Sequence, residues 1–145
     1  MIYLDTSVVA AFYWTEALSD TVEQLLRHEA EPGLSQLVEV ELFSALSRRV
    51  RMGEIYREDA RLIVERFQAD LDNGFYTRIV LEAIHYHLAR EWIGRFDTPL
   101  RTLDALHLAI AAENGLRLVT ADEALAGSAE AFGVEVQILR PPTEA

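Results

Sequence analysis

The sequence predicts an α/β protein of three layers, in which helices cover both faces of a mostly parallel central sheet of four to five strands. Short apolar runs of strand length alternate along the chain with longer segments whose apolar residues recur at helical spacing. This alternation is typical of parallel strands joined by helical crossovers. Glycine, proline and asparagine separate the segments, and no internal repeat or linker divides the chain.

The expected elements follow one another in a regular order. They are strand 2–4, helix 8–14, helix 18–30, strand 34–35, helix 36–52, helix 57–69, strand 75–80, helix 82–96, helix 103–113, strand 116–120, helix 121–132 and strand 134–139.

Local signals set the ends of these elements. Ser7 stands before an apolar run and is expected to cap the first helix. Gly53 is expected to end the helix 36–52. Pro99 disfavours a helical residue before it, so a break is expected near Asp97-Thr98. Thr102 is expected to start the next helix.

Length and composition predict one domain in a reducing compartment. The 145 residues are half hydrophobic, so we expect a single domain over 1–140 and a loose tail over 141–145. The chain has no cysteine, which excludes disulfides and thiolate sites and fits a cytoplasmic location. No signal pattern and no apolar run of membrane-spanning length is present, so we expect no membrane partner.

The net charge is −11, and all thirteen basic residues are arginines. An acidic chain does not bind nucleic acid tightly through its overall charge. A nucleic-acid substrate remains compatible with the sequence, because acids can gather around a cation while arginines gather elsewhere.

Two aspartates follow predicted strands. Asp5 comes directly after the run 2–4, and Asp122 follows the strand 116–120 after Thr120. In open α/β folds, ligands bind outside the carboxyl ends of the strands. The alternative for both residues is a helix cap. For Asp5 we expect Ser7 to be the cap, which would leave the Asp5 carboxylate free.

Two further acids interrupt apolar helices. Glu41 falls between Leu37 and Ala45 on the helical wheel, where a charge costs free energy unless it is paired, metal-bound or at the helix edge. Asp104 lies near the start of a helix that is apolar almost all round. The alternatives are an exposed position for Glu41 and capping or helix-dipole stabilisation for Asp104.

If the four acids converge, their mutual repulsion raises some of their pKa values unless a cation lies between them. Oxygen ligands alone favour Mg²⁺ or Mn²⁺ over zinc. Such a site suits the hydrolysis of a phosphodiester by metal-activated water.

Four segments, in this order, resemble the motifs of the PIN-domain family, and the whole chain is similar to VapC-type toxins. The segments are Ile2-Tyr3-Leu4-Asp5-Thr6-Ser7, Glu41-Leu42-Phe43-Ser44-Ala45-Leu46, Leu103-Asp104-Ala105-Leu106-His107-Leu108-Ala109 and Val119-Thr120-Ala121-Asp122. VapC toxins are the ribonuclease half of bacterial and archaeal toxin–antitoxin pairs.

The resemblance implies a function and a set of site residues. It implies that Asp5, Glu41, Asp104 and Asp122 form an acidic metal site, with Thr6 and Thr120 as the hydroxyls beside it. It further implies cleavage of single-stranded or looped RNA with Mg²⁺ or Mn²⁺, a homodimer, and inhibition by a VapB-type antitoxin. Glu39 is a rival to Glu41, and Glu123 is a rival to Asp122.

Other polar residues have weaker assignments. Arg48, Arg49 and Arg101 are candidates for RNA phosphate contacts, with a solvated helix end as the alternative for the first two. His107 is expected to be a core or hydrogen-bonded residue rather than a metal ligand. Two other functions stay open, a PIN-like binding module with weak or no hydrolysis and a different Mg²⁺-dependent phosphohydrolase.

Overall fold

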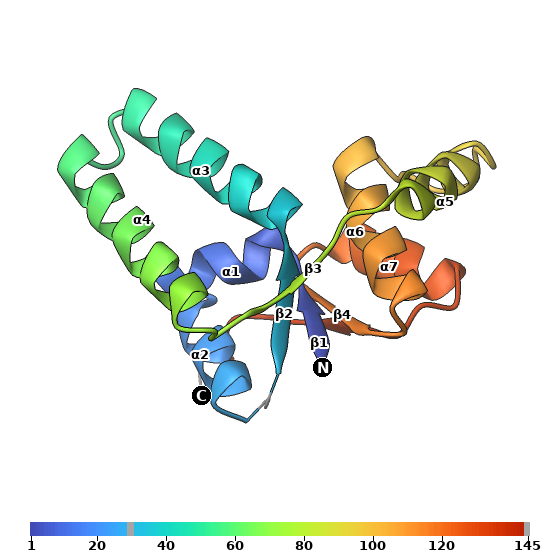
Figure 1. The fold of residues 1–145 in the computed structure, drawn as a ribbon, viewed down its shortest axis with the longest axis horizontal. Coiled ribbons are helices and arrows are strands. Elements are labelled where there is room, and N and C mark those ends of the chain that lie inside the picture. The colour runs from blue at the N-terminus through green and yellow to red at the C-terminus, as the bar shows by residue number, and fades with distance from the viewer. Residues whose placement is uncertain (29–30, 144–145) are drawn as a thin grey trace.

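A computed structural model describes residues 1–28 and 31–143, and it places a single five-stranded sheet between two groups of helices (Figure 1). The elements in chain order are β1 (Ile2–Leu4), α1 (Thr6–Tyr13), α2 (Ser19–His28), β2 (Pro32–Ser35), α3 (Gln36–Arg51), α4 (Arg57–Asp72), β3 (Thr77–Ile79), α5 (Ala83–Ile93), α6 (Thr102–Glu113), β4 (Arg117–Thr120), α7 (Glu123–Ala131) and β5 (Val136–Ile138).

The sheet has the strand order β3-β2-β1-β4-β5, and each of its four strand pairs is parallel. β1 lies in the middle, with Tyr3 opposite Gly33 of β2 on one side and opposite Leu118 of β4 on the other. The chain leaves β1 toward β2 and later returns to the other side of β1 with β4. The carboxyl end of β1 is therefore the point where the strand order switches direction, which is where open α/β sheets bind ligands.

Gly33 is required by close packing beside the central strand. A Cβ atom at this position would lie 2.9 Å from Cδ1 of Ile79 and 3.0 Å from the carbonyl oxygen of Ile2. A side chain here would push β2 away from its neighbours.

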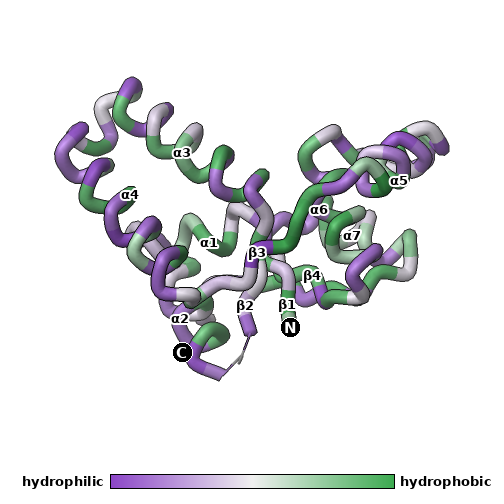
Figure 2. Tube along the Cα trace, viewed as in Figure 1, coloured by the Kyte–Doolittle hydropathy of each residue, from purple (hydrophilic) through white to green (hydrophobic). Residues whose placement is uncertain are grey.

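The helices form two layers. Helices α1 to α4 lie on one face of the sheet and α5 to α7 on the other, and α3 and α4 extend beyond the sheet as a hairpin (Figure 1). Residues along α3 and α4 alternate between hydrophilic and hydrophobic (Figure 2), as expected for helices that bury one side. In contrast, α6 is buried continuously from Ala105 to Ala111, which confirms the prediction for this helix.

The predicted fold class is confirmed, and the differences lie at the ends of elements. β3 and β5 are shorter than the runs 75–80 and 134–139. The helix expected over 82–96 ends at Ile93, and Phe96 takes a left-handed φ of 55°. α4 continues three residues past the expected Ala69, and Gly74 with φ of 73° closes the turn.

Two expectations extend beyond the described residues. Residues 29–30 of the helix expected over 18–30, and residues 144–145 of the expected tail, lie outside them. The division into a domain over 1–140 and a tail over 141–145 stays a prediction. Within residues 1–28 and 31–143, none of the helices has both the length and the hydrophobicity of a membrane span.

Candidate functional site

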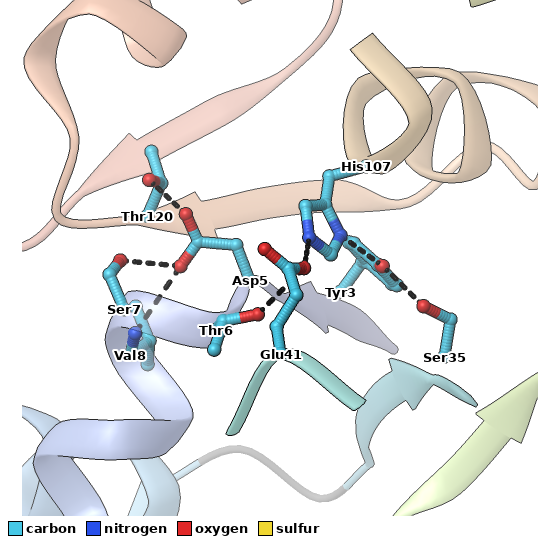
Figure 3. A network of polar contacts seen from close by, with 9 residues as sticks. All are labelled: Tyr3, Asp5, Thr6, Ser7, Val8, Ser35, Glu41, His107 and Thr120. Atoms are coloured by element: carbon cyan, nitrogen blue, oxygen red, sulfur yellow. Dashed lines mark hydrogen bonds and ion pairs between the residues drawn. The ribbon is translucent and has the colours of Figure 1, made fainter. Parts of the chain in front are cut away.

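Asp5 lies at the carboxyl end of β1 and is almost completely buried, with 5% of its surface exposed. Its Oδ1 accepts hydrogen bonds from Ser7 Oγ at 2.6 Å and from the backbone N–H of Val8 at 3.2 Å. Its Oδ2 accepts one from Thr120 Oγ1 at 2.5 Å (Figure 3). A carboxylate has about four lone-pair positions, so the Asp5 carboxylate has one position left for a further ligand.

The expectation that Ser7 caps the first helix was wrong. α1 begins at Thr6, and Asp5 itself is the N-cap through its bond from Val8. Ser7 lies inside the first turn and donates to the carboxylate instead. The physical reason is that Asp5, in extended conformation directly before the helix, is placed to accept from the free N–H of Val8. Asp5 therefore has a capping role and a possible ligand position on the same carboxylate.

Two hydroxyl groups join the end of β4 to the end of β1. Thr120 Oγ1 donates to Asp5 and accepts from the backbone N–H of Asp122 at 3.0 Å. Ser7 Oγ accepts from the backbone N–H of Ala121 at 3.1 Å. The turn that carries Asp122 is thus held beside the turn that carries Asp5.

Asp122 is exposed and caps α7. Its Oδ1 accepts from the N–H groups of Ala124 at 2.8 Å and Leu125 at 3.1 Å. Both bonds use the same oxygen.

Glu41 reaches the same region from α3. Its Oε1 accepts from Thr6 Oγ1 at 3.0 Å and contacts Nε2 of His107 at 2.5 Å (Figure 3). His107 is 2% exposed and lies on α6, on the opposite face of the sheet. The expectation that His107 is a buried, hydrogen-bonded residue is confirmed.

Asp104 is half-buried on α6, and its electrostatics connect the four acids. Burial is the largest cause of the raised pKa of the Asp104 carboxyl, and the negative charge of Asp122 is the next largest. Asp5 and Glu41 also raise this pKa, whereas His107 lowers it. The negative charge of one carboxylate raises the pKa of another when the two are not separated by much solvent.

Burial also raises the pKa of Asp5, against the hydrogen bonds from Ser7 and Thr120, which lower it. The charged forms of Asp5 and Asp104 are thus both destabilised. A cation between them would offset this cost.

The donor set fits a hard divalent cation, because it consists of carboxylate oxygens with hydroxyls beside them. Within the described part of the chain, however, no three acidic or histidine side chains are gathered at the spacing of a metal cluster. Binding of a cation by several of these carboxylates therefore requires their side chains to move closer together.

The family model for the PIN domain matches residues 2–130. The chain belongs to the PIN-domain family. None of the curated proteins matches the sequence closely enough to be called a relative.

Solved structures share this fold at low sequence identity. FitAcB from Neisseria gonorrhoeae is 17% identical with a TM-score of 0.74, over 94% of this chain and 96% of that one. VapC20 from Mycobacterium tuberculosis, described as a sarcin-ricin loop cleaving toxin, is 21% identical with a TM-score of 0.71, over 98% and 100%. VapBC2 from Rickettsia felis, bound to a DNA fragment from its promoter, is 16% identical with a TM-score of 0.69, over 97% and 100%.

The two rival acids of this PIN domain lie elsewhere. Glu39 forms a two-fold ion pair with Arg78 of β3, at 3.1 and 3.0 Å. Glu123 is exposed and faces Arg140 at 3.4 Å. Neither carboxylate contributes to the electrostatics of Asp104.

The three candidate arginines of the PIN domain have different surroundings. Arg49 pairs with Glu54 at 3.2 Å and its guanidinium lies 5.1 Å from the centre of the Trp14 ring. Arg48 is exposed on the same helix. Arg101 is exposed at the N-cap of α6, three residues before Asp104.

Sequence reasoning missed the residues behind Glu41. His107 Nδ1 contacts the hydroxyl of Tyr3 at 2.6 Å, and that hydroxyl contacts Ser35 Oγ at 2.8 Å. A tyrosine within a buried central strand was the available signal, because a buried tyrosine hydroxyl requires a hydrogen-bond partner.

Proposed function

We propose that this PIN domain is a Mg²⁺- or Mn²⁺-dependent endoribonuclease and the toxin of a type II toxin–antitoxin pair, inhibited by a VapB-type antitoxin. The observation that carries the proposal is geometric: Thr120 ties the turn of Asp122 to Asp5, and Thr6 bonds Glu41, beside the strand switch point. The charges of Asp5, Glu41 and Asp122 also raise the pKa of Asp104. Perturbed acids at such a position are typical of functional sites.

We propose the four acids as the metal ligands and as the catalytic residues. When bound, Mg²⁺ or Mn²⁺ lowers the pKa of a water molecule and offsets negative charge on the phosphodiester. Asp5 would bind through Oδ2 while its Oδ1 stays with the cap of α1. Thr6 and Thr120 would hold Glu41 and Asp5 in place through the hydrogen bonds that they donate.

In the proposed reaction the oxygen of water bonds to phosphorus and the bond from phosphorus to the 3′ oxygen breaks. The products are a 5′-phosphate and a 3′-hydroxyl end. Arg101, beside the Asp104 helix, and the arginines of α3 are proposed contacts for RNA phosphates, since guanidinium binds phosphate in a planar geometry.

The toxin assignment is supported by the structures that share the fold, several of which are described as toxin–antitoxin complexes. We further propose a homodimer, which is supported by exposed apolar side chains on and beside α5 such as Val80, Ile84 and Tyr86. The absence of cysteine from the sequence supports a cytoplasmic location.

RNA cleavage by the purified protein tests the proposal. We expect cleavage of a structured RNA with Mg²⁺ or Mn²⁺, loss of cleavage in EDTA, and loss in Asp5→Asn, which keeps the shape but removes the ligand charge. Asp59→Asn, at an exposed aspartate of α4, is the matched control. Cleavage that persists in Asp5→Asn would exclude the assigned site.

A second candidate function is a PIN-like binding module without hydrolysis. It is favoured by two observations. Asp5 and Asp122 already cap helices, and the described acids are not gathered closely enough to hold a metal ion. It predicts tight binding of a protein partner and intact RNA under every metal condition. Sequencing of RNA ends after induced expression separates the two functions, because only the nuclease generates new 5′-phosphate ends.

A further inference from the structure

A line of hydrogen bonds leads from the protein core to Glu41. It runs from Ser35 Oγ to the Tyr3 hydroxyl at 2.8 Å, from there to His107 Nδ1 at 2.6 Å, and from Nε2 to Glu41 Oε1 at 2.5 Å (Figure 3). Ser35 and Tyr3 have no exposed surface, and His107 is 2% exposed. Four different elements, β2, β1, α6 and α3, supply the four side chains.

With Glu41 ionised and His107 neutral, the hydrogen bonds of this line have a single direction. An ionised Glu41 only accepts hydrogen bonds, so Nε2 of His107 must carry the proton and donate. In a neutral imidazole Nδ1 is then the acceptor, so the Tyr3 hydroxyl donates to it. The Tyr3 oxygen in turn accepts from Ser35.

Every donor in the line therefore points toward Glu41. A buried polar line of this kind costs free energy unless each member is satisfied, and phenylalanine would fill the Tyr3 position without that demand. Loss of the Tyr3 hydroxyl would leave Nδ1 of His107 and the hydroxyl of Ser35 without this partner.

We propose that Ser35, Tyr3 and His107 are positioning residues that hold the Glu41 carboxylate in one orientation, with Oε1 bound and Oε2 directed to the cation. Both hydrogen bonds that Glu41 accepts, from His107 and Thr6, go to Oε1. The role of Glu41 as a ligand rests on the proposed function, whereas the tautomer of His107 is independent of it. Partners that orient a metal ligand in this way typically change metal affinity about 10–100-fold when removed.

The first measurement is the tautomer of His107 in the metal-free protein, read from the imidazole nitrogens by NMR. We expect a protonated Nε2 and an unprotonated Nδ1. In Tyr3→Phe we expect the ¹⁵N chemical shift of His107 Nδ1 to change, because the hydroxyl that donates to it is absent. A protonated Nδ1 in the wild-type protein would overturn the proposal.

The second measurement is Mn²⁺ affinity. We expect His107→Leu to bind Mn²⁺ about 10–100-fold more weakly. His107→Gln should retain most of the affinity, because its amide N–H₂ can donate from the position of Nε2. His87→Leu, at an exposed histidine of α5, is the control and should bind like the wild type.

Folding of each variant is checked by thermal unfolding, and Tyr3→Phe replaces His107→Leu if the latter does not fold. Equal loss of affinity in His107→Gln and His107→Leu, or no loss in either, would overturn the positioning role. If the wild-type protein binds no Mn²⁺, the proposed function fails. The NMR result still decides whether the hydrogen bonds from Ser35 through Tyr3 and His107 all run toward Glu41.

Discussion

Nε2 of His107 lies 2.5 Å from Oε1 of Glu41, although the two residues are 66 positions apart and lie on helices that cover opposite faces of the sheet. This bond joins α3 to α6 beyond the carboxyl end of β1. The Glu41 carboxylate of one layer also raises the pKa of the half-buried Asp104 of the other layer. The proposed acidic site therefore depends on the fold, and single residues in it are expected to have effects that depend on their partners.

The two glutamates of α3 should behave differently. Glu41→Gln removes a charge that acts on Asp104 and a partner of His107, so we expect a loss of about 100-fold in RNA cleavage and weaker Mn²⁺ binding. Glu39→Gln should keep both properties, because Glu39 pairs with Arg78 on the edge strand β3. Equal effects of the two substitutions in cleavage assays would contradict this assignment.

Removing the charge of Asp104 should stabilise the metal-free protein. The pKa of Asp104 is raised in the folded state, so the folded protein keeps this proton to a higher pH than the unfolded chain. Stability is therefore lost as pH rises through the window between the unfolded and folded pKa values, and the loss persists above it. Asp104→Asn cannot ionise, so its advantage should be absent at acidic pH and largest at neutral pH.

The check is the Tm of wild type and Asp104→Asn in EDTA over a series of pH values. We expect the variant to have a higher Tm than the wild type at neutral pH and the same Tm at acidic pH. Asp59→Asn serves as the exposed control. A variant that is less stable than wild type at neutral pH would show that the repulsion among the acids is not significant.

Thr120 should contribute to stability, because its hydroxyl connects the residues that follow β1 to those that follow β4. Thr120→Val keeps the shape but leaves Asp5 Oδ2 and the backbone N–H of Asp122 without their shared partner. We expect a loss of about 1–3 kcal/mol in the free energy of unfolding, measured with urea. Thr77→Val, at an exposed strand position of β3, is the matched control and should change stability little.

Arg49 should contribute to stability. Its guanidinium lies against Trp14 and pairs with Glu54, so Arg49→Ala should cost about 1 kcal/mol in thermal or urea unfolding. A wild-type Tm in this variant would mean that the two contacts have no net effect.

Arg48 should contribute to RNA binding without contributing to stability. It is exposed, so Arg48→Ala should leave the Tm unchanged and reduce the slope of log affinity against log salt concentration by about one phosphate contact. Affinity is measured with catalytically inactive Asp5→Asn as the background. An unchanged slope would remove Arg48 from the RNA surface.

The sequence predicts the fold well because each element carries its own signal. The spacing of apolar residues identifies α3, the long apolar segment after Thr102 identifies α6, and the short run at 2–4 identifies β1. The ends of the helices and strands are less predictable, because they depend on which side chain bonds to the free backbone N–H and C=O groups there. Asp5 and Ser7 both have side chains suited to capping, and only the geometry shows that Asp5 accepts from Val8 while Ser7 donates to Asp5.

The hydrogen-bond line behind Glu41 was beyond prediction from the sequence. Its members are spread over four elements, and the packing of α6 against the sheet determines which of them meet. Tyr3 lies in an apolar run and His107 in an apolar helix, so each has the pattern of a core residue. Their pairing depends on the register of β1 beside β4 and on the placement of α6, which no local pattern encodes.

We propose that Asp5, Glu41, Asp104 and Asp122 form one cation site. Anomalous diffraction from crystals soaked in Mn²⁺ tests it most directly. We expect a peak within ligand distance of the carboxylates of Asp5 and Asp104, with Glu41 and Asp122 drawn toward it, and no such peak in Asp104→Asn. A peak at another position, or none at saturating Mn²⁺, would contradict the claim.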